Sequence, residues 1–231
     1  AIEATRSVVE FNTNLGIVLL CAPLVHAATA RMDEPVFRLR LHTTLDALNV
    51  EDAELAYRAI RLAQPGGLGQ SAKHDVSQPP QVRLREAMHE ARERDRIAYQ
   101  YVTDYRDVFA TGLPAMREGL DKWGSREWAA VHTYLALLGR HIDSHVARKH
   151  GVRVAEEVSA QARELSQTLG RSRDPAGEMP ALAELDRQWK AQSINPGTSA
   201  DLTVAALVTM DIEDSLEQDA MESECALGIG E

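Results

Sequence analysis

Apolar positions recur along the chain at intervals of three and four residues, which is the spacing of one face of a helix. Residues 15–31 are almost uniformly apolar and predict a buried helix, whereas residues 50–63 and 152–170 are amphipathic and run into glycines. β-Branched residues rarely alternate with polar ones. We therefore predict an all-α fold, a single bundle-like domain over residues 1–231 with about eight to ten helices.

The same periodicity predicts the remaining elements. The segment 82–109 is read as one long charged helix with a single apolar stripe, and Ser125 is expected to cap the helix that it begins. The stretch from Glu34 to residue 48 has a less regular pattern and is expected to be irregular. Helices are predicted at residues 1–11, 82–109, 112–124, 125–151 and 181–192.

Charge and cysteine content narrow the range of partners. A net charge of −10 and a pI near 5.3 disfavour nucleic acid, because binding a polyanion needs clustered Lys and Arg. The apolar run at residues 15–28 is shorter than the roughly twenty residues that span a bilayer, so no membrane partner is expected. Cys21 and Cys225 lack metal-binding spacing and favour a cytoplasmic protein. Small molecules are the expected partners, and a homo-oligomer is left open.

Clusters of polar residues interrupt the helical pattern at four junctions, and each has two readings. At residues 12–16, either Thr13 or Asn14 caps the following helix, or the amides hold phosphate or ribose oxygens. At residues 66–75, the glycines allow close backbone approach, Lys73 neutralises a phosphate and Asp75 holds hydrated Mg²⁺, but a solvated loop explains the composition equally well.

The other two junctions carry acids beside cations or hydroxyls. Asp143 is followed by Arg148 and Lys149, which suits a magnesium-bound polyphosphate, although cations at a helix C-terminus also complement its dipole. His141 and His145 stand one helical turn apart, but without a third ligand no zinc site is predicted. At residues 195–201, the hydroxyls and acid form either a capping box or an anion cradle.

Together these junctions resemble the triphosphoribosyl-dephospho-CoA synthase family, most nearly its shorter homologues of unassigned substrate. NTNLG at residues 12–16 stands where the synthases have Asn-Thr-His-Lys-Gly. IDSHVARKHG at residues 142–151 is similar to their Asp-Thr or Asp-Ser helix, and NPGTSADLTVAAL at residues 195–207 to their Pro-Gly-Gly-Ser-Ala-Asp-Leu segment. The resemblance extends over nearly the whole chain.

The resemblance implies a reaction in which a hydroxyl acceptor attacks the anomeric carbon of the ribose of ATP, releasing adenine, with Mg²⁺ bound beside the nucleotide. Asp143 and Asp201 are then the expected catalytic residues, and both are expected to bind the metal together with Asp75. The expected nucleotide and phosphate ligands are Asn12, Thr13, Asn14, Gly67, Lys73, His74, Arg148, Lys149, Asn195, Thr198 and Ser199.

Two departures from the family pattern affect the expected substrate. Asn14 and Leu15 replace a histidine and a lysine, and the family's N-terminal Pro-Lys-Pro-Gly and His-x-Asp elements are not among these residues, so that segment is expected to be missing. We therefore expect a changed acceptor, for instance in the biosynthesis of one-carbon carriers of methylotrophs. A kinase- or ligase-type enzyme using ATP and a non-catalytic helical scaffold are the alternatives.

Overall fold

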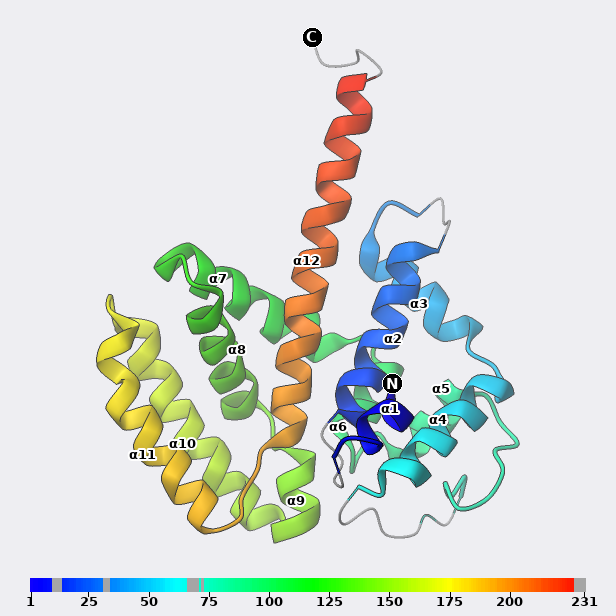
Figure 1. Cartoon of the computed structure of the whole chain (residues 1–231), viewed down its shortest axis with the longest axis horizontal. Coiled ribbons are helices and arrows are strands. Elements are labelled where there is room, and N and C mark those ends of the chain that lie inside the picture. Colours follow the sequence, from blue (N-terminus) through cyan, green and yellow to red (C-terminus); the bar gives the residue numbers. More distant parts are fainter. Residues whose placement is uncertain (10–13, 31–33, 66–70, 72, 227–231) are drawn as a thin grey trace.

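The longest helix, α12, runs through the middle of the molecule, with α1 to α6 on one side and α7 to α11 on the other (Figure 1). The structure, a computed structural model, describes residues 1–9, 14–30, 34–65, 71 and 73–226. This part of the chain contains helices and no strand, which confirms the all-α prediction, with more helices than expected. The α-helices are Ile2–Arg6 (α1), Leu15–Thr29 (α2), Phe37–Ala47 (α3), Val50–Ala63 (α4), Leu84–Ala91 (α5), Arg96–Val102 (α6), Leu113–Trp123 (α7), Arg126–Arg140 (α8), Ser144–His150 (α9), Val152–Arg171 (α10), Met179–Ala191 (α11) and Gly197–Ala226 (α12).

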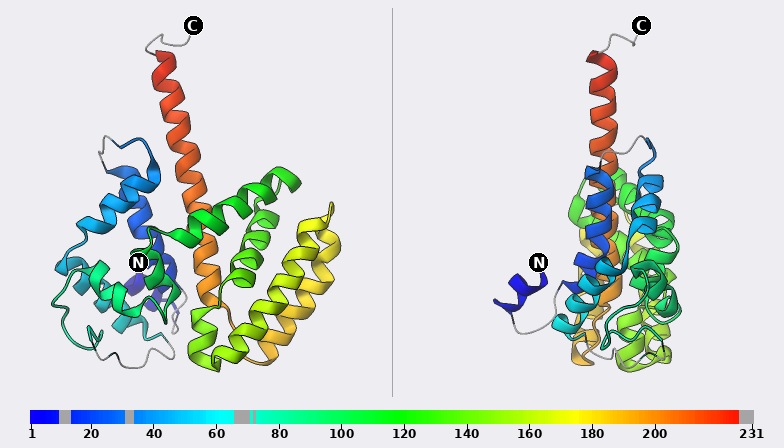
Figure 2. Two further views of the ribbon diagram at one scale, coloured as in Figure 1. Left: turned by 180° about the vertical axis from the view of Figure 1, so that it is seen from behind. Right: turned by 90° about the vertical axis from the view of Figure 1, so that its right-hand side faces the viewer.

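The two largest apolar cores lie on opposite sides of α12, one on each side. The larger core joins α2, α3, α6 and the first half of α12 and includes Leu20, Leu41 and Leu202, all essentially inaccessible to solvent. The second core joins α8, α10 and α11 and includes Leu138 and Trp189. The distal half of α12 projects beyond both cores (Figures 1 and 2). None of the helices described is long and apolar enough to cross a membrane.

Helix α2 contains Pro23, which has no N–H group to donate to the carbonyl of Leu19 one turn earlier. The hydroxyl of Tyr101 in α6 donates to this carbonyl at 2.6 Å, and the hydroxyl of Tyr105 donates to the neighbouring carbonyl of Leu20 at 2.9 Å. Both tyrosine rings are buried. The pair therefore satisfies a backbone acceptor inside the core and joins α2 to α6.

Three predicted boundaries are wrong. Residues 37–47 form α3, because Phe37, Leu41 and Leu45 share one buried face despite the polar residues between them. The segment 82–109 is two helices and a π-helical turn (Val108–Gly112), since Asp95 caps a new helix by accepting from the N–H groups of Ile97 and Ala98. The segment 125–151 likewise breaks, because Asp143 caps α9.

Local capping signals predict other helix ends correctly. Ser125 caps α8 through the N–H of Trp128, and Gly124 closes α7 in the left-handed conformation at φ 63°. Helix α4 spans the predicted residues 50–63, and its start is stabilised by a capping box between Asn49 and Asp52.

Candidate active site

A cavity that opens to solvent lies where α2, α4, α5, α6, α9 and the start of α12 meet Ser71 and the segment 73–76, and it encloses about 1130 Å³ when the solvent at its mouth is included. Segments that are far apart in the sequence therefore form one site. Each of the four polar junctions contributes to the lining: the first through Gly16, the second through Ser71 and residues 73–75, the third through His145 and Arg148, and the fourth through Thr198 and Asp201.

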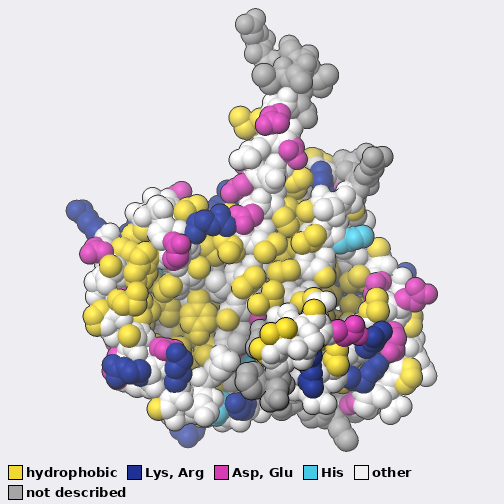
Figure 3. Space-filling model, viewed as in Figure 1, with side chains coloured by type: hydrophobic (Ala, Val, Ile, Leu, Met, Phe, Trp, Pro, Cys, Tyr) yellow, Lys and Arg dark blue, Asp and Glu magenta, His cyan; other side chains and the backbone are white. Residues whose placement is uncertain are grey.

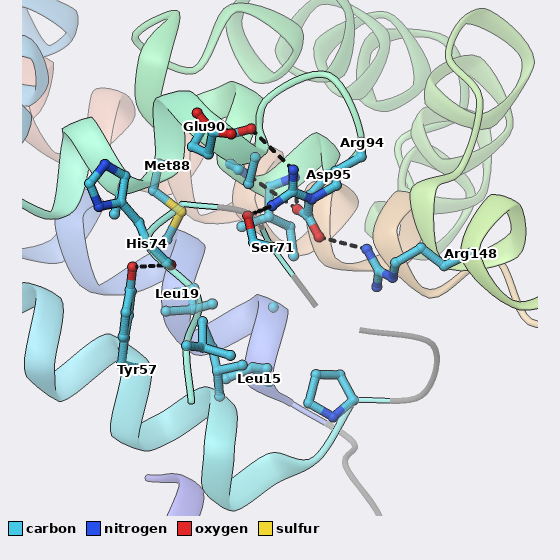
Figure 4. Close-up of a pocket in the computed structure, with 18 of the residues that line it drawn as sticks. Leu15, Leu19, Tyr57, Ser71, His74, Met88, Glu90, Arg94, Asp95 and Arg148 are labelled. Carbon is cyan, nitrogen blue, oxygen red and sulfur yellow. Dashed lines mark hydrogen bonds and ion pairs between the residues drawn. The ribbon is translucent and has the colours of Figure 1, made fainter. Parts of the chain in front are cut away.

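One wall of the cavity carries the cations (Figure 4). The Nη1 atom of Arg148 lies 2.6 Å from Oδ2 of Asp95, while Oδ1 of Asp95 caps α6. Arg94 donates to the hydroxyl of Ser71 at 2.8 Å. The Nε atom of Arg148 is buried and has no hydrogen-bond partner within the described part of the chain. This guanidinium therefore retains a donor for a further acceptor.

The opposite wall is more apolar. Leu19 and Met88 line it, and the hydroxyl of Tyr57 donates to the backbone carbonyl of His74 at 2.6 Å (Figure 4). Burial raises the pKa of Tyr57, and the charge of Asp75 adds to the shift. Tyr57 therefore stays protonated at neutral pH and holds the segment that carries His74 against α4.

Asp201 lies in the cavity directly beside Gly16. A Cβ atom on Gly16 would lie 1.9 Å from Oδ2 of Asp201, so any larger residue at position 16 would displace the carboxyl group. Asp201 makes no hydrogen bond and no ion pair with any residue that the structure describes. Burial raises the pKa of Asp201 to about 7, and the negative charges of Asp143 and Asp95 contribute to the rise. Asp201 can therefore carry or release a proton near neutral pH.

Asp143 has the opposite environment. Its Oδ1 accepts from the N–H groups of His145 at 2.9 Å and Val146 at 3.0 Å. Its Oδ2 accepts from the N–H of Ser199 at 2.8 Å and from the hydroxyl of Ser199 at 2.9 Å. Only 1% of the residue is exposed, so its carboxylate is committed to joining the start of α9 to the start of α12.

Two hydroxyl groups extend this junction. The Oγ of Ser144 and the Oγ1 of Thr198 are 3.0 Å apart, and Thr198 also accepts from the N–H of His145 at 3.2 Å. The N–H of Arg96 donates to Ser144 at 3.1 Å. The first turns of α6, α9 and α12, which carry the cavity-lining groups, are thus held in one hydrogen-bonded cluster.

His141 and His145 do not face each other across one helical turn. His141 follows α8 and lies against Arg96 and Asp107, whose ion pair is bidentate at 2.6 and 2.9 Å. Burial lowers the pKa of His141 to about 4, against a smaller opposing contribution from Asp107. His145 instead begins α9 and lines the cavity.

The structure divides the predicted site residues into four groups. Asn14 donates to Thr5, Lys149 is exposed, and Asn195 is exposed at a separate groove, so these three lie outside the cavity. Asp143 and Ser199 lie beneath it. Asn12, Thr13 and Gly67 lie outside the described residues. The predicted residues that line the cavity are Lys73, His74, Asp75, Arg148, Thr198 and Asp201.

The three predicted metal ligands do not form one site. Asp75 accepts from the N–H groups of Ser71 and Ser77, and hydrogen bonds from Ser77 and Ser71 lower its pKa to about 2. Both carboxylate oxygens of Asp143 already accept hydrogen bonds from the protein. Within the described ranges, no group of three His, Cys, Asp or Glu residues could hold a metal ion.

Several cavity residues are not evident from the sequence. The apolar stripe of residues 82–109 places Arg94 and Asp95 on the solvent-exposed faces of one long helix, although an aspartate before an apolar run is a signal for a new helix start. The spacing of His145 suggests only a pairing with His141. The sequence does not mark Tyr57 as a site residue, because its place in the apolar periodicity of residues 50–63 is that of a core residue. The lining residues that the sequence did not single out include Gly16, Tyr57, Ser71, Glu90, Arg94, Asp95 and His145.

A second, apolar groove lies between α8, α10 and α11, on the other side of α12. Trp128, Tyr134 and Leu182 line it, with Asn195 at one end. Figure 3 shows hydrophobic side chains gathered over this part of the surface. Because the groove has few polar groups, the candidate active site remains the cavity that contains Asp201.

Comparisons with known proteins identify the family of the chain. The family described as CitG, ATP:dephospho-CoA triphosphoribosyl transferase, matches residues 1–220 of the chain. The comparison with curated proteins gave no significant match. Among solved structures, the chain is similar to one from Archaeoglobus fulgidus provisionally described as a triphosphoribosyl-dephospho-CoA synthase, with a TM-score of 0.62 and 24% identity over 84% of this chain and 81% of that one. This second likeness is one of fold.

Proposed function

Because the chain belongs to the ATP:dephospho-CoA triphosphoribosyl transferase family and is thus an ATP-dependent transferase, we propose that the cavity beside Asp201 is where its reaction takes place. The triphosphoribosyl group of ATP moves to a hydroxyl group of the acceptor. The bond between C1′ of the ribose and N9 of adenine breaks, and a bond forms between C1′ and the acceptor oxygen. The hydroxyl loses its proton, and adenine leaves after gaining one.

The single observation that carries the proposal is the state of Asp201. A carboxyl group with a pKa of about 7 is partly protonated at neutral pH and can donate that proton to the departing purine. Once it has done so, its negative charge stabilises the positive charge that develops on the ribose in an oxocarbenium-like transition state. Asp201 is free for this role because no described side chain neutralises it.

The cationic wall suits the triphosphate. Arg148, Arg94 and Lys73 line the cavity, and the Nε of Arg148 has an unused donor. Charge-assisted hydrogen bonds from guanidinium groups to phosphate oxygens are strong and directional. In this proposal, Asp95 keeps Arg148 oriented through their 2.6 Å ion pair before the nucleotide binds.

Mg²⁺ in this proposal is the counter-ion of the triphosphate. It commonly keeps several waters and binds through substrate phosphates with one or two carboxylates. Asp75 and Asp143 use their oxygens for local hydrogen bonds, so neither is assigned as a ligand. The metal takes no part in the proton transfers proposed here.

Dephospho-CoA is the first acceptor to test, since the family is defined by it. We place the reaction in the cytoplasm, where ATP is available. We also propose, from Asn14 and Leu15, that the acceptor differs from that of the family. Asn14 lies outside the cavity, whereas Leu15 contributes an apolar surface to it.

The test compares Asp201→Asn with Asp211→Asn, an exposed residue further along the same helix that pairs with Arg126. With ATP, Mg²⁺ and dephospho-CoA, we expect Asp201→Asn to lower the rate of adenine release by about 10²- to 10⁴-fold, the usual contribution of a general acid. The control should keep the wild-type rate. Chromatography of adenine measures both.

The pH dependence supplies an independent readout. Because Asp201 must be protonated to act as an acid, the wild-type kcat should fall as the pH rises through about 7, and this alkaline limb should be absent in Asp201→Asn. Binding of ATP by isothermal titration shows whether the variant is folded. Formation of ADP or AMP without adenine would favour the kinase or ligase alternative and overturn the proposal.

A further inference from the structure

We infer that His145 is the general base that takes the proton from the acceptor hydroxyl, a role that rests on the proposed function. The imidazole lines the same cavity as Asp201, from the first turn of α9. In the part of the chain that the structure describes, neither ring nitrogen makes a hydrogen bond or an ion pair. The ring therefore has a free acceptor for a substrate proton.

The position of His145 is closely defined. Its backbone N–H donates both to Oδ1 of Asp143 at 2.9 Å and to Oγ1 of Thr198 at 3.2 Å. Its ring packs against Gly197, where a Cβ atom would lie 3.1 Å from Nδ1. The same cluster of hydrogen bonds sets the start of α12, so His145 and Asp201 are held in a constant relative geometry. Such preorganisation is what a pair of proton-transfer groups requires.

The surroundings of His145 keep its ring neutral. Burial lowers the pKa of His145, with Asp143 opposing the shift and Arg148, Lys149 and His150 adding to it. Those four groups belong to α9 or its cap. Asp201 of α12 and Asp95, which precedes α6, line the same cavity as the ring. A neutral imidazole is the form that can accept a proton.

The two groups thus divide the acid and base work of the transfer. Their environments move the pKa of the carboxyl up and that of the imidazole down, so at neutral pH the acid is available in its protonated form while the base is deprotonated. His145 accepts the hydroxyl proton as the acceptor oxygen bonds to C1′. Asp201 gives its proton to adenine as the bond from C1′ to N9 breaks.

Other carboxylates in the cavity are less suited to the base role. Asp95 is engaged by Arg148 and by the cap of α6, and Asp75 is engaged by Ser71 and Ser77. Glu90 is the remaining carboxylate of the lining. Glu90→Gln is therefore the competing variant in the test.

The test measures adenine release from ATP and Mg²⁺ with dephospho-CoA by the full chain and by His145→Gln, His145→Ala and Glu90→Gln. We expect His145→Gln to lower kcat by about 10²- to 10⁴-fold with little change in KM for ATP. The acidic limb of the wild-type pH profile should be absent, while the alkaline limb remains. Added imidazole should partly restore His145→Ala. His26→Gln, at an exposed position of α2, is the control.

The outcomes separate this inference from the proposed function. If the wild-type chain releases adenine but His145→Gln keeps its rate and its acidic limb, the role of His145 is wrong and the proposed function stands. Loss of the acidic limb in Glu90→Gln instead would assign the base to Glu90. If imidazole restores nothing although His145→Ala binds ATP as tightly as the wild type, His145 is structural. No adenine release by the wild type overturns both proposals.

Discussion

Two aspartates near the same junction show how strongly a residue's role depends on its surroundings. Asp143 and Asp201 are both carboxylates next to helix starts. Asp143 accepts four hydrogen bonds, which occupy both of its carboxylate oxygens, whereas Asp201 faces the cavity with no partner among the described residues. Asp143 is therefore best understood as a residue that positions the α9–α12 junction, and Asp201 is the residue to which the proposed function assigns proton transfer.

Adjacent cations on α9 provide a test of the phosphate role at this scale. Arg148 lines the cavity, and Lys149 is exposed outside it. Loss of a charged hydrogen bond costs about 1.5–3 kcal/mol, so Arg148→Ala should weaken binding of ATP and Mg²⁺ by about 10- to 100-fold. Lys149→Ala should change it by less than about twofold, because an exposed charge is screened. Isothermal titration measures both, and equal losses would place the triphosphate elsewhere.

At the scale of the elements, α2 connects the core to the cavity. Leu15, Gly16 and Leu19 line the cavity near its N-terminus, and Pro23 interrupts its hydrogen bonding one turn later. Tyr101 compensates by donating to the carbonyl of Leu19. The contact fixes α2 against α6, which begins next to Asp95. The relative position of α2 and α6, which form two walls of the cavity, thus depends on the hydrogen bond from the Tyr101 hydroxyl.

Tyr101→Phe should therefore destabilise the protein. The substitution leaves the part-buried carbonyl of Leu19 without its hydrogen-bond partner, which costs about 1–3 kcal/mol. Tyr99→Phe is the matched control, since Tyr99 also lies on α6 but its hydroxyl makes no hydrogen bond within the residues described, and its effect should stay within about 0.5 kcal/mol. Urea unfolding gives both values. Equal stability of the two variants would contradict this account of α2.

At the scale of the whole molecule, α12 contributes to the larger core through Leu202 and to a smaller apolar cluster with Met116 of α7 through Met210. Its first turn contributes Thr198 and Asp201 to the cavity, its middle packs against α2 on one side and α8 on the other, and its distal part projects into solvent (Figure 2). A ligand that bridges α2, α9 and α12 therefore contacts segments belonging to both sides. Its binding should stabilise the fold as one unit.

ATP with Mg²⁺ should accordingly raise the melting temperature in a single transition. At a ligand concentration 100 times Kd the stabilisation is about 2.7 kcal/mol, which for a chain of this size corresponds to a shift of about 5–10 °C. AMP, which lacks two of the phosphates, should give a smaller shift at the same concentration. Differential scanning calorimetry would decide against this picture if the transition split and only one component moved.

The sequence alone determined what depends on neighbours along the chain. The period of apolar residues predicts the all-α class, and Ser125 and Gly124 mark helix ends correctly. The sequence pattern does not predict α3, because polar residues stand between Phe37 and Leu41, which tertiary packing buries on one face. Clustered acids, hydroxyls and cations mark the four junctions in the sequence, and the structure brings described residues of each junction to one cavity.

Only the tertiary structure decided the role of each residue at those junctions. A helix-capping aspartate and a proton-transferring aspartate look the same in sequence, since burial, the charges of distant segments and the acceptors already filled are set by the packing of α9 against α12. The same holds for Asp95 and His145, whose partners come from other helices. Local interactions therefore set the helices, and long-range contacts set the chemistry of the cavity, because a side chain's free acceptor and its pKa depend on every element around it.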